Sequence, residues 1–133
     1  MPSKKRVKIV NREGVDFKKL ILIFLAVLAI VLIFYVFDFL AHSSSPNFGV
    51  PSYYFKNKII YGTLWGLIIY YFIRKLRPIN KALIFSAFVS TILQIRYYLE
   101  GYQKLFVFEF LFIHFIILLP ASWIIFWLLR KKI

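Results

Sequence analysis

Residues 20–37 read LILIFLAVLAIVLIFYVF, an uninterrupted run of eighteen apolar side chains. A helix of about 20 apolar residues crosses the hydrocarbon core of a bilayer, and this run continues past Asp38 to about Ala41. Continuous apolar runs favour helices over barrel strands, because barrel strands alternate apolar and polar residues. The run therefore predicts a transmembrane helix over residues 20–40.

Three more apolar stretches are long enough, or nearly long enough, to cross a bilayer. With the first, the predicted spans are residues 20–40, 55–73, 82–99 and 105–129. The chain of 133 residues is 62% hydrophobic, whereas soluble domains are nearer half apolar. The links between spans are short, which implies antiparallel neighbours. The sequence therefore predicts an all-α integral membrane protein, in which a basic cytoplasmic leader (residues 1–19) precedes a domain of four antiparallel transmembrane helices (residues 20–133).

Basic residues mark one side of these spans. Fourteen of the 18 lysines and arginines precede the first span, join the second to the third, or follow the fourth. They are Lys4, Lys5, Arg6, Lys8, Arg12, Lys18, Lys19, Arg74, Lys75, Arg77, Lys81, Arg130, Lys131 and Lys132. Because positively charged loops stay in the cytoplasm, we expect both termini to be cytoplasmic (N-in, C-in), in the cell membrane. Anionic lipids are the partners expected at that face.

The net charge of +13 has a second interpretation, because basic patches also bind nucleic acid. The basic residues lie at span boundaries, however, and no recognition fold has room to form among the spans. We therefore do not expect nucleic acid as a partner. A ribosome or nucleic-acid contact by residues 1–19 is the alternative.

The few ionisable side chains within or beside the spans gather toward the non-cytoplasmic half. Such groups are costly in a bilayer and usually face a helix bundle, another charge or water. The candidate polar site comprises Asp38, His42, Gln94, Arg96, Glu100, Glu109 and His114. Asp38 and His42 are spaced i,i+4, so we expect them on one face of the first span. The same spacing predicts an interfacial ion pair between Arg96 and Glu100.

Glu109 and His114 share the fourth span but not a face. Five residues apart on a helix, they point roughly 140° apart, so we do not expect them to be direct partners. His114 lies about 7.5 Å deeper in the membrane than Glu109. A histidine at that depth could relay protons, or it could be a hydrogen-bonded packing residue.

Small residues on two spans predict helix packing. Gly62 and Gly66 form a GxxxG pattern, which lets helix backbones approach closely. Ala87, Ser90 and Thr91 belong to a small and polar stripe on the third span, and we expect the two surfaces to be complementary. The alternative is that the stripe lines a path for a substrate, since the same residue types serve both purposes.

Three other side chains are interpreted as interfacial. Lys56 and Lys58, near the start of the second span, are expected to snorkel to the lipid headgroups. Tyr97 falls among tyrosines at the outer boundary, where an aromatic belt is typical.

Motifs of familiar enzymes and cofactor sites are absent from the sequence. It contains no HExxH, GxSxG, GxGxxG, Walker A or CxxC pattern and no cysteine. With two histidines, a zinc site would need carboxylates brought together from separate helices. We therefore predict no catalytic residue, no metal site and no cofactor.

Three hypotheses of function follow. The first is a noncatalytic subunit, scaffold or assembly factor, acting as a homo-oligomer or within a larger membrane complex. The second is a small oligomeric transporter or channel for a cation, a proton-coupled solute or a small molecule, with Glu109 as the binding carboxylate, His114 as a relay, and Asp38 with Arg96 as an outer gate. The third is an outer-leaflet lipid-modifying enzyme using Asp38, His42 and Glu109 as acid–base groups.

Overall fold

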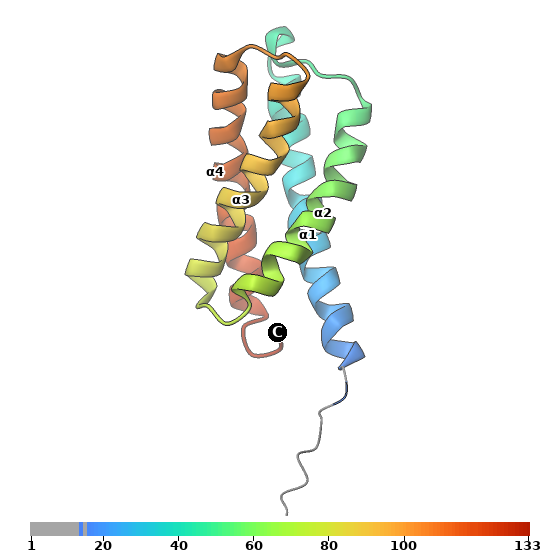
Figure 1. Cartoon of the computed structure of the whole chain (residues 1–133), viewed down its shortest axis with the longest axis vertical. Helices are drawn as coiled ribbons and strands as arrows, with labels where there is room; N and C mark the ends of the chain where they lie inside the picture. Colours follow the sequence, from blue (N-terminus) through green and yellow to red (C-terminus); the bar gives the residue numbers. More distant parts are fainter. Residues whose placement is uncertain (1–13, 15) are drawn as a thin grey trace, which may run out of the picture.

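The computed structural model describes residue 14 and residues 16–133. These residues form four α-helices, α1 (Phe17–Ser43), α2 (Tyr53–Ile73), α3 (Pro78–Leu99) and α4 (Lys104–Leu128), and one 3₁₀ turn, η1 (Pro46–Phe48). The helices run alternately up and down in an antiparallel bundle (Figure 1). Each contains or nearly contains the span predicted for it. Most of the predicted basic leader, residues 1–13 and 15, lies outside the described residues.

Three of the described helices, α1, α3 and α4, are long and apolar enough to cross a membrane. They indicate a membrane protein. Helix α2 has 21 residues, but it does not meet the same criterion of length and composition. Lys56, Asn57 and Lys58 in its first turns account for much of its lower hydropathy.

Apolar side chains of α1 that face the bundle form a stripe at helical spacing. Val27, Ile30 and Phe34 are at most 1% exposed, and Asp38 and His42 continue the same stripe toward the end of the helix. Because the run of residues 20–37 is apolar on every side, its other faces remain exposed apolar surface. Exposed apolar surface of this extent suits a lipid environment better than water.

The turn between α3 and α4 is closed by a glycine. Gly101 has a φ of 85°, a left-handed conformation that glycine adopts without steric cost. The backbone N–H of Tyr102 donates to the carbonyl of Tyr97, and that of Gly101 donates to Tyr98, which is the Schellman arrangement of a helix end. The ring of Tyr102 packs edge-on against Tyr97, so the turn fixes the position of Tyr97 at the end of α3.

The two glycines of the GxxxG pattern face the bundle, but chiefly toward α1. A Cβ at Gly62 would meet Val31 at 3.4 Å, an ordinary contact. A Cβ at Gly66 would lie 2.8 Å from Cγ1 of Val27 and 3.1 Å from the ring of Phe85. Gly66 is therefore the position where α1 and α3 approach α2 too closely for a side chain.

The small residues of α3 do not face these glycines as expected. Ser90 is buried, whereas Ala87 and Thr91 are exposed and line a shallow groove with aromatic residues of α4. One residue before this stripe, the hydroxyls of Ser86 and Ser122 hydrogen-bond at 3.1 Å between α3 and α4. The small and polar side of α3 thus lies along α4 rather than α2.

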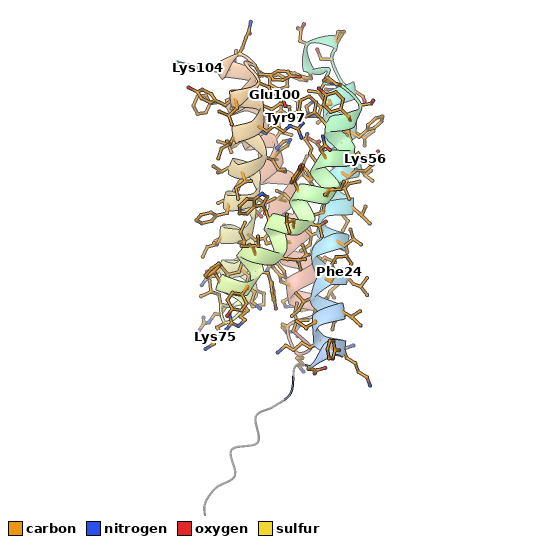
Figure 2. All side chains as sticks on the ribbon, turned by 45° about the vertical axis from the view of Figure 1, so that its right-hand side comes forward. Phe24, Lys56, Lys75, Tyr97, Glu100 and Lys104 are labelled. Atoms are coloured by element: carbon orange, nitrogen blue, oxygen red, sulfur yellow. The ribbon has the colours of Figure 1, made fainter. Side chains whose placement is uncertain are left out.

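Charged residues gather at the two ends of the bundle. We call the end with residues 44–52 and 100–103 the loop end, and the opposite end, where α1 begins and α4 ends, the terminal end. Figure 2 shows Lys56, Glu100 and Lys104 toward the loop end and Lys75 at the terminal end. The other described basic residues that were predicted to share one side also lie at the terminal end, in the first turn of α1, the α2–α3 turn, the first turn of α3 and the residues after α4.

Candidate functional site

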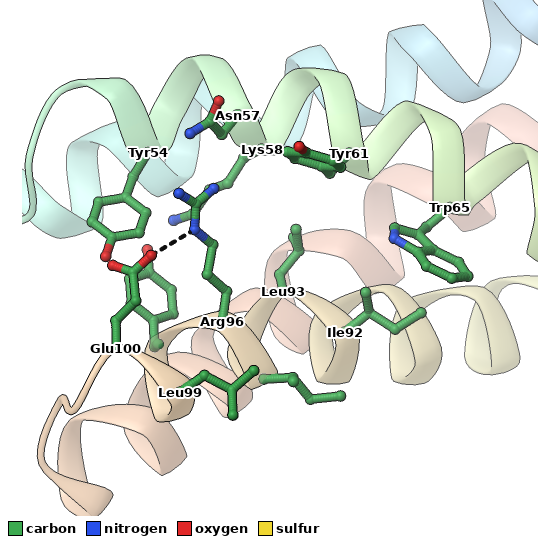
Figure 3. Close-up of a pocket in the computed structure, with 12 residues that line it drawn as sticks. Tyr54, Asn57, Lys58, Tyr61, Trp65, Ile92, Leu93, Arg96, Leu99 and Glu100 are labelled. Atoms are coloured by element: carbon green, nitrogen blue, oxygen red, sulfur yellow. Dashed lines mark hydrogen bonds and ion pairs between the residues drawn. The ribbon is translucent and has the colours of Figure 1, made fainter.

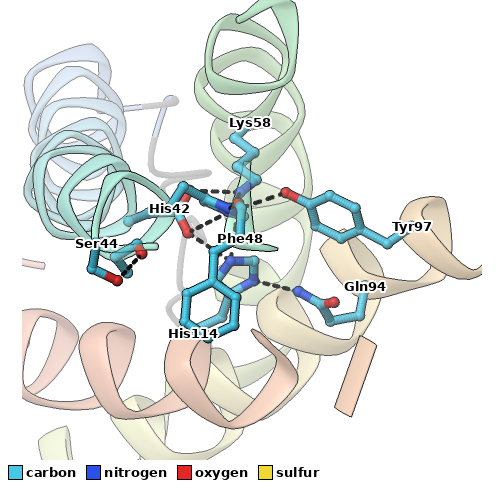
Figure 4. Close-up of polar contacts among 9 residues, drawn as sticks. His42, Ser44, Phe48, Lys58, Gln94, Tyr97 and His114 are labelled. Carbon is cyan, nitrogen blue, oxygen red and sulfur yellow. Dashed lines mark hydrogen bonds and ion pairs between the residues drawn. The ribbon is translucent and has the colours of Figure 1, made fainter. Parts of the chain in front are cut away.

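Six polar side chains from all four helices meet inside the half of the bundle nearer the loop end. We call this group the polar cluster (Figure 4). Its members are Asp38 and His42 of α1, Lys58 of α2, Gln94 and Tyr97 of α3, and His114 of α4. Each of them is at most 4% exposed. Buried charges are costly unless they are paired and hydrogen-bonded, so the arrangement of partners decides what this cluster can do.

Asp38 is the anion at the centre of the cluster. Its Oδ2 accepts a hydrogen bond of 2.5 Å from the Lys58 ammonium, and its Oδ1 lies 2.7 Å from Nε2 of His114. Both carboxylate oxygens are thus used, by two different helices. The contact with Oδ1 requires that Nε2 of His114 carries the hydrogen, because an ionised carboxylate can only accept.

His42 offers the cluster a lone pair rather than a hydrogen. Its Nδ1 lies 2.6 Å from the carbonyl oxygen of Phe48 in η1, and a carbonyl can only accept, so Nδ1 is the protonated nitrogen. Nε2 of the neutral ring then accepts from the Lys58 ammonium at 3.1 Å and from the Tyr97 hydroxyl at 3.4 Å. The loop between α1 and α2 therefore selects the tautomer that His42 presents.

Gln94 hydrogen-bonds to the other ring nitrogen of His114. Its Nε2 lies 2.7 Å from Nδ1 of the histidine ring. Since Nε2 of His114 carries the hydrogen, Nδ1 is unprotonated and the Gln94 amide donates to it. The amide oxygen of Gln94 is buried and has no hydrogen-bond partner among the described residues.

With these protonation states, the net charge of the cluster is zero. Asp38 and Lys58 carry opposite charges, and the hydrogen bonds described above fit neutral rings for His42 and His114. Aromatic rings enclose it: His42 stacks on Phe110 with 4.0 Å between ring centroids, and Phe34 meets His114 edge-on at 5.0 Å. The cluster is therefore a neutral, enclosed set of polar groups between apolar layers.

A groove between α2 and α3 reaches one side of the cluster. It has a volume of about 470 Å³ and is lined at the cluster by Lys58 and Tyr97 and farther along by Tyr61 and Trp65 (Figure 3). Arg96 and Glu100 line the same groove, joined by an ion pair of 2.9 Å. Lys58 and Tyr97 thus contact both the groove and the cluster, Lys58 through Asp38 and Tyr97 through His42.

The structure brings together four of the seven candidate residues. Asp38, His42, Gln94 and His114 belong to the cluster. Arg96 and Glu100 pair with each other, and their side chains are each 37% exposed. Glu109 is exposed and makes no hydrogen bond or ion pair with the described residues, so the transporter hypothesis loses its proposed binding carboxylate.

Sequence reasoning missed Lys58 and Tyr97. The expectation that Lys58 snorkels to the headgroups is wrong, because its side chain is buried against Asp38. A signal was present: Lys58 lies four residues before Gly62, on the same helix face as the GxxxG pattern, and that face is buried. Tyr97 is 1% exposed, which excludes it from an interfacial belt, and it follows Gln94 by three residues.

Asp38, His42 and His114 also have the chemistry of metal ligands. Each offers one ligand atom, and these atoms all lie within 4.8 Å of one another. The prediction of no metal site rested on the scarcity of histidine and on carboxylates having to come from separate helices. In the structure, one carboxylate and both histidines meet from two helices, α1 and α4.

Comparison of the chain with protein-family models, curated proteins and solved structures finds no match.

Proposed function

We propose that all four helices cross the membrane and that both termini are cytoplasmic. A helix of 21 residues such as α2 is about 31 Å long, close to the thickness of the hydrocarbon core. Lys58, which lowers its hydropathy, points into the bundle, so lipid would meet side chains such as Ile60, Leu64 and Ile68. The basic residues at the terminal end then support a cytoplasmic position for that end.

Labelling of introduced cysteines tests this topology, because the chain has no cysteine of its own. We expect a membrane-impermeant maleimide to label Asn47→Cys, in the loop after α1, on intact cells expressing the protein. Asn80→Cys, at the terminal end, should react only after the membrane is permeabilised. The opposite pattern would show that the loop end is cytoplasmic.

We propose further that the protein is a small transport protein for a cation and that the polar cluster is its binding site. The observation that supports this best is the position of the Lys58 ammonium. It lies 2.5 Å from a carboxylate oxygen of Asp38 and 3.1 Å from the lone pair of His42. The cluster thus holds a buried ammonium, compensated by the Asp38 carboxylate, among apolar helices. Ionisable groups at such depths are rare and mark ion pathways.

The groove between α2 and α3 also supports transport, because it reaches the cluster. Lys58 and Tyr97 line it, and Lys58 is hydrogen-bonded to Asp38, so an ion in the groove would lie next to side chains of the cluster. Four short helices enclose little volume, and we retain the expectation that several copies assemble into the working unit.

A noncatalytic subunit remains the second candidate, because the cluster connects all four helices and would also serve as a clamp. Transport measurements separate the two. We expect the purified protein in liposomes to carry a cation, tested with K⁺, Mg²⁺ and Zn²⁺ and reporter dyes. Asp38→Asn should reduce flux to that of empty liposomes, because the neutral amide no longer attracts a cation.

Asp16→Asn is the matched control for this measurement. Asp16 caps α1 through the backbone N–H of Lys19 and is exposed, and asparagine caps helices equally well. Flux through this variant should equal that of the wild type. If the folded wild-type protein carries none of the three cations, the subunit hypothesis replaces the transporter.

A further inference from the structure

We infer that Asp38, His42 and His114 form a binding site for a divalent transition-metal ion of the Zn²⁺ type, which displaces the Lys58 ammonium. Its role as cargo rests on the proposed transport function, whereas binding itself does not. Four observations carry the inference: the spacing of the ligand atoms, the support of His42, the partner of His114, and the place to which Lys58 can move.

The ligand atoms lie within 4.8 Å of one another, and the two distances from Asp38 approach the spacing that a metal ion imposes. Tetrahedral zinc with bonds of 2.0–2.1 Å holds neighbouring ligand atoms about 3.3 Å apart. Oδ1 of Asp38 lies 3.4 Å from Nε2 of His42 and 2.7 Å from Nε2 of His114. Lys58 Nζ already lies among the three side chains, 2.5 Å from Oδ2 of Asp38 and 3.1 and 3.5 Å from the two histidine nitrogens.

His42 is already in the state that binds metal. A histidine ligand typically donates its other ring N–H to a carbonyl or carboxylate, which orients the ring and fixes its tautomer. Nδ1 of His42 donates to the carbonyl of Phe48 at 2.6 Å. The lone pair of Nε2 therefore points toward Asp38 and Lys58 without any rearrangement.

His114 becomes a ligand by a change of tautomer, which the Gln94 amide can accommodate by rotating. In the metal-free cluster its Nε2 carries the hydrogen and Gln94 donates to Nδ1. Metal on Nε2 requires the other tautomer, in which Nδ1 carries the hydrogen and needs an acceptor. Rotation of the Gln94 amide would supply its oxygen, which has no hydrogen-bond partner in the described part of the chain.

Lys58 must leave before the metal binds, because two buried cations a few ångströms apart repel strongly. Its side chain lines both the cluster and the groove of about 470 Å³. A change of rotamer would carry the ammonium from Asp38 into that groove. Lys58 is thus an internal cation that occupies the site in the absence of metal and competes with it.

The set of ligands selects the class of metal. Two imidazole nitrogens and one carboxylate suit first-row divalent ions such as Zn²⁺, whereas Ca²⁺ and Mg²⁺ prefer six or more oxygen ligands. On the groove side, departure of Lys58 would leave a fourth position open for water. Such an open position is compatible with exchange of the ion rather than permanent structural binding.

Calorimetry with ZnCl₂ on the full chain in detergent tests the inference. We expect one Zn²⁺ per chain, and tetrahedral absorption bands with Co²⁺ as a substitute. Lys58→Met should bind Zn²⁺ at least about tenfold more tightly than the wild type, because the competing cation is removed. Lys56→Met, which removes an exposed lysine two residues away, should leave the affinity unchanged.

Substitution of the ligands gives the opposite result. His42→Gln and His114→Gln should each weaken Zn²⁺ binding by more than about tenfold. If Lys58→Met folds only when Zn²⁺ is present, that result also supports the site. The inference is overturned if neither the wild type nor Lys58→Met binds Zn²⁺, or if both histidine variants bind it as tightly as the wild type.

These results are distinguishable from failure of the proposed function. Zn²⁺ binding without flux in liposomes would retain the metal site and reject transport. Flux of K⁺ or Mg²⁺ without Zn²⁺ binding would retain transport and overturn the metal site.

Discussion

Asp38→Asn is expected to lower the free energy of unfolding by about 3–5 kcal/mol, the usual cost of removing one partner from a buried ion pair. The cost arises because the Lys58 ammonium, which is 4% exposed, would lose the charge that compensates it. His114 would also lose its charged acceptor at 2.7 Å. Unfolding in mixed detergent micelles with increasing dodecyl sulfate measures the difference.

Two further variants show whether the lost pairing is the cause. The double variant Asp38→Asn with Lys58→Met removes both charges and should recover most of the stability, because no unpaired charge remains. Glu100→Gln removes one partner of the exposed Arg96–Glu100 pair and should change stability by less than about 1 kcal/mol. A loss in Asp38→Asn no larger than that of Glu100→Gln would contradict the assignment of Asp38 as the compensating anion.

The positions of the helices could be predicted closely from the sequence. Apolar length and charged or turn-forming residues at the boundaries determine a span, and both are local properties. The first predicted span, residues 20–40, lies within α1, and the second, residues 55–73, begins two residues after α2 does. Helix α1 also continues to Ser43, which places Asp38 and His42 on one face as their i,i+4 spacing predicted.

The direction in which each helix faces was harder to predict, because α1 and α4 are apolar on nearly every side. Only polar residues then indicate the inward face. The predicted span of residues 105–129 contains two ionisable residues, Glu109 and His114, which point roughly 140° apart. At most one of them could face the cluster, and Ser122, eight residues after His114, is the other polar residue of that span. The structure places His114 inside, opposite Asp38.

Lys58 is an exception to the general rule for lysines near the end of a span. A lysine five residues into α2 is close enough to the boundary to snorkel, and most such lysines need no other explanation. Its burial depends on Asp38, which is 20 residues away in the sequence and comes from another helix. The face shared with Gly62 and Gly66 was the available local evidence, and it indicates burial more reliably than distance from the span boundary.

Phe110→Ala is expected to have a similarly large effect, about 3–5 kcal/mol of lost stability, because it leaves a cavity in a closely packed position. Phe110 is fully buried. Its ring stacks on His42 with 4.0 Å between centroids and an interplanar angle of 4°. Phe112→Ala is the matched control on the same helix, since Phe112 is 65% exposed. The same unfolding measurement compares the two.

The consequence of Phe110→Ala for the cluster is separate from its cost in stability. Phe110 stacks on the His42 ring, whose Nδ1 donates to the carbonyl of Phe48 and whose Nε2 accepts from Lys58. Without Phe110, the cavity lies beside polar groups that can bind water, so we expect it to fill with water. Deuterium exchange in the first half of α4 should then be faster in Phe110→Ala than in Phe112→Ala. Equal stability and equal exchange in the two variants would show that Phe110 does not exclude water from the cluster. If its ring does enclose the cluster, removing the ring must lower both the stability of the protein and the protection of its amides from exchange.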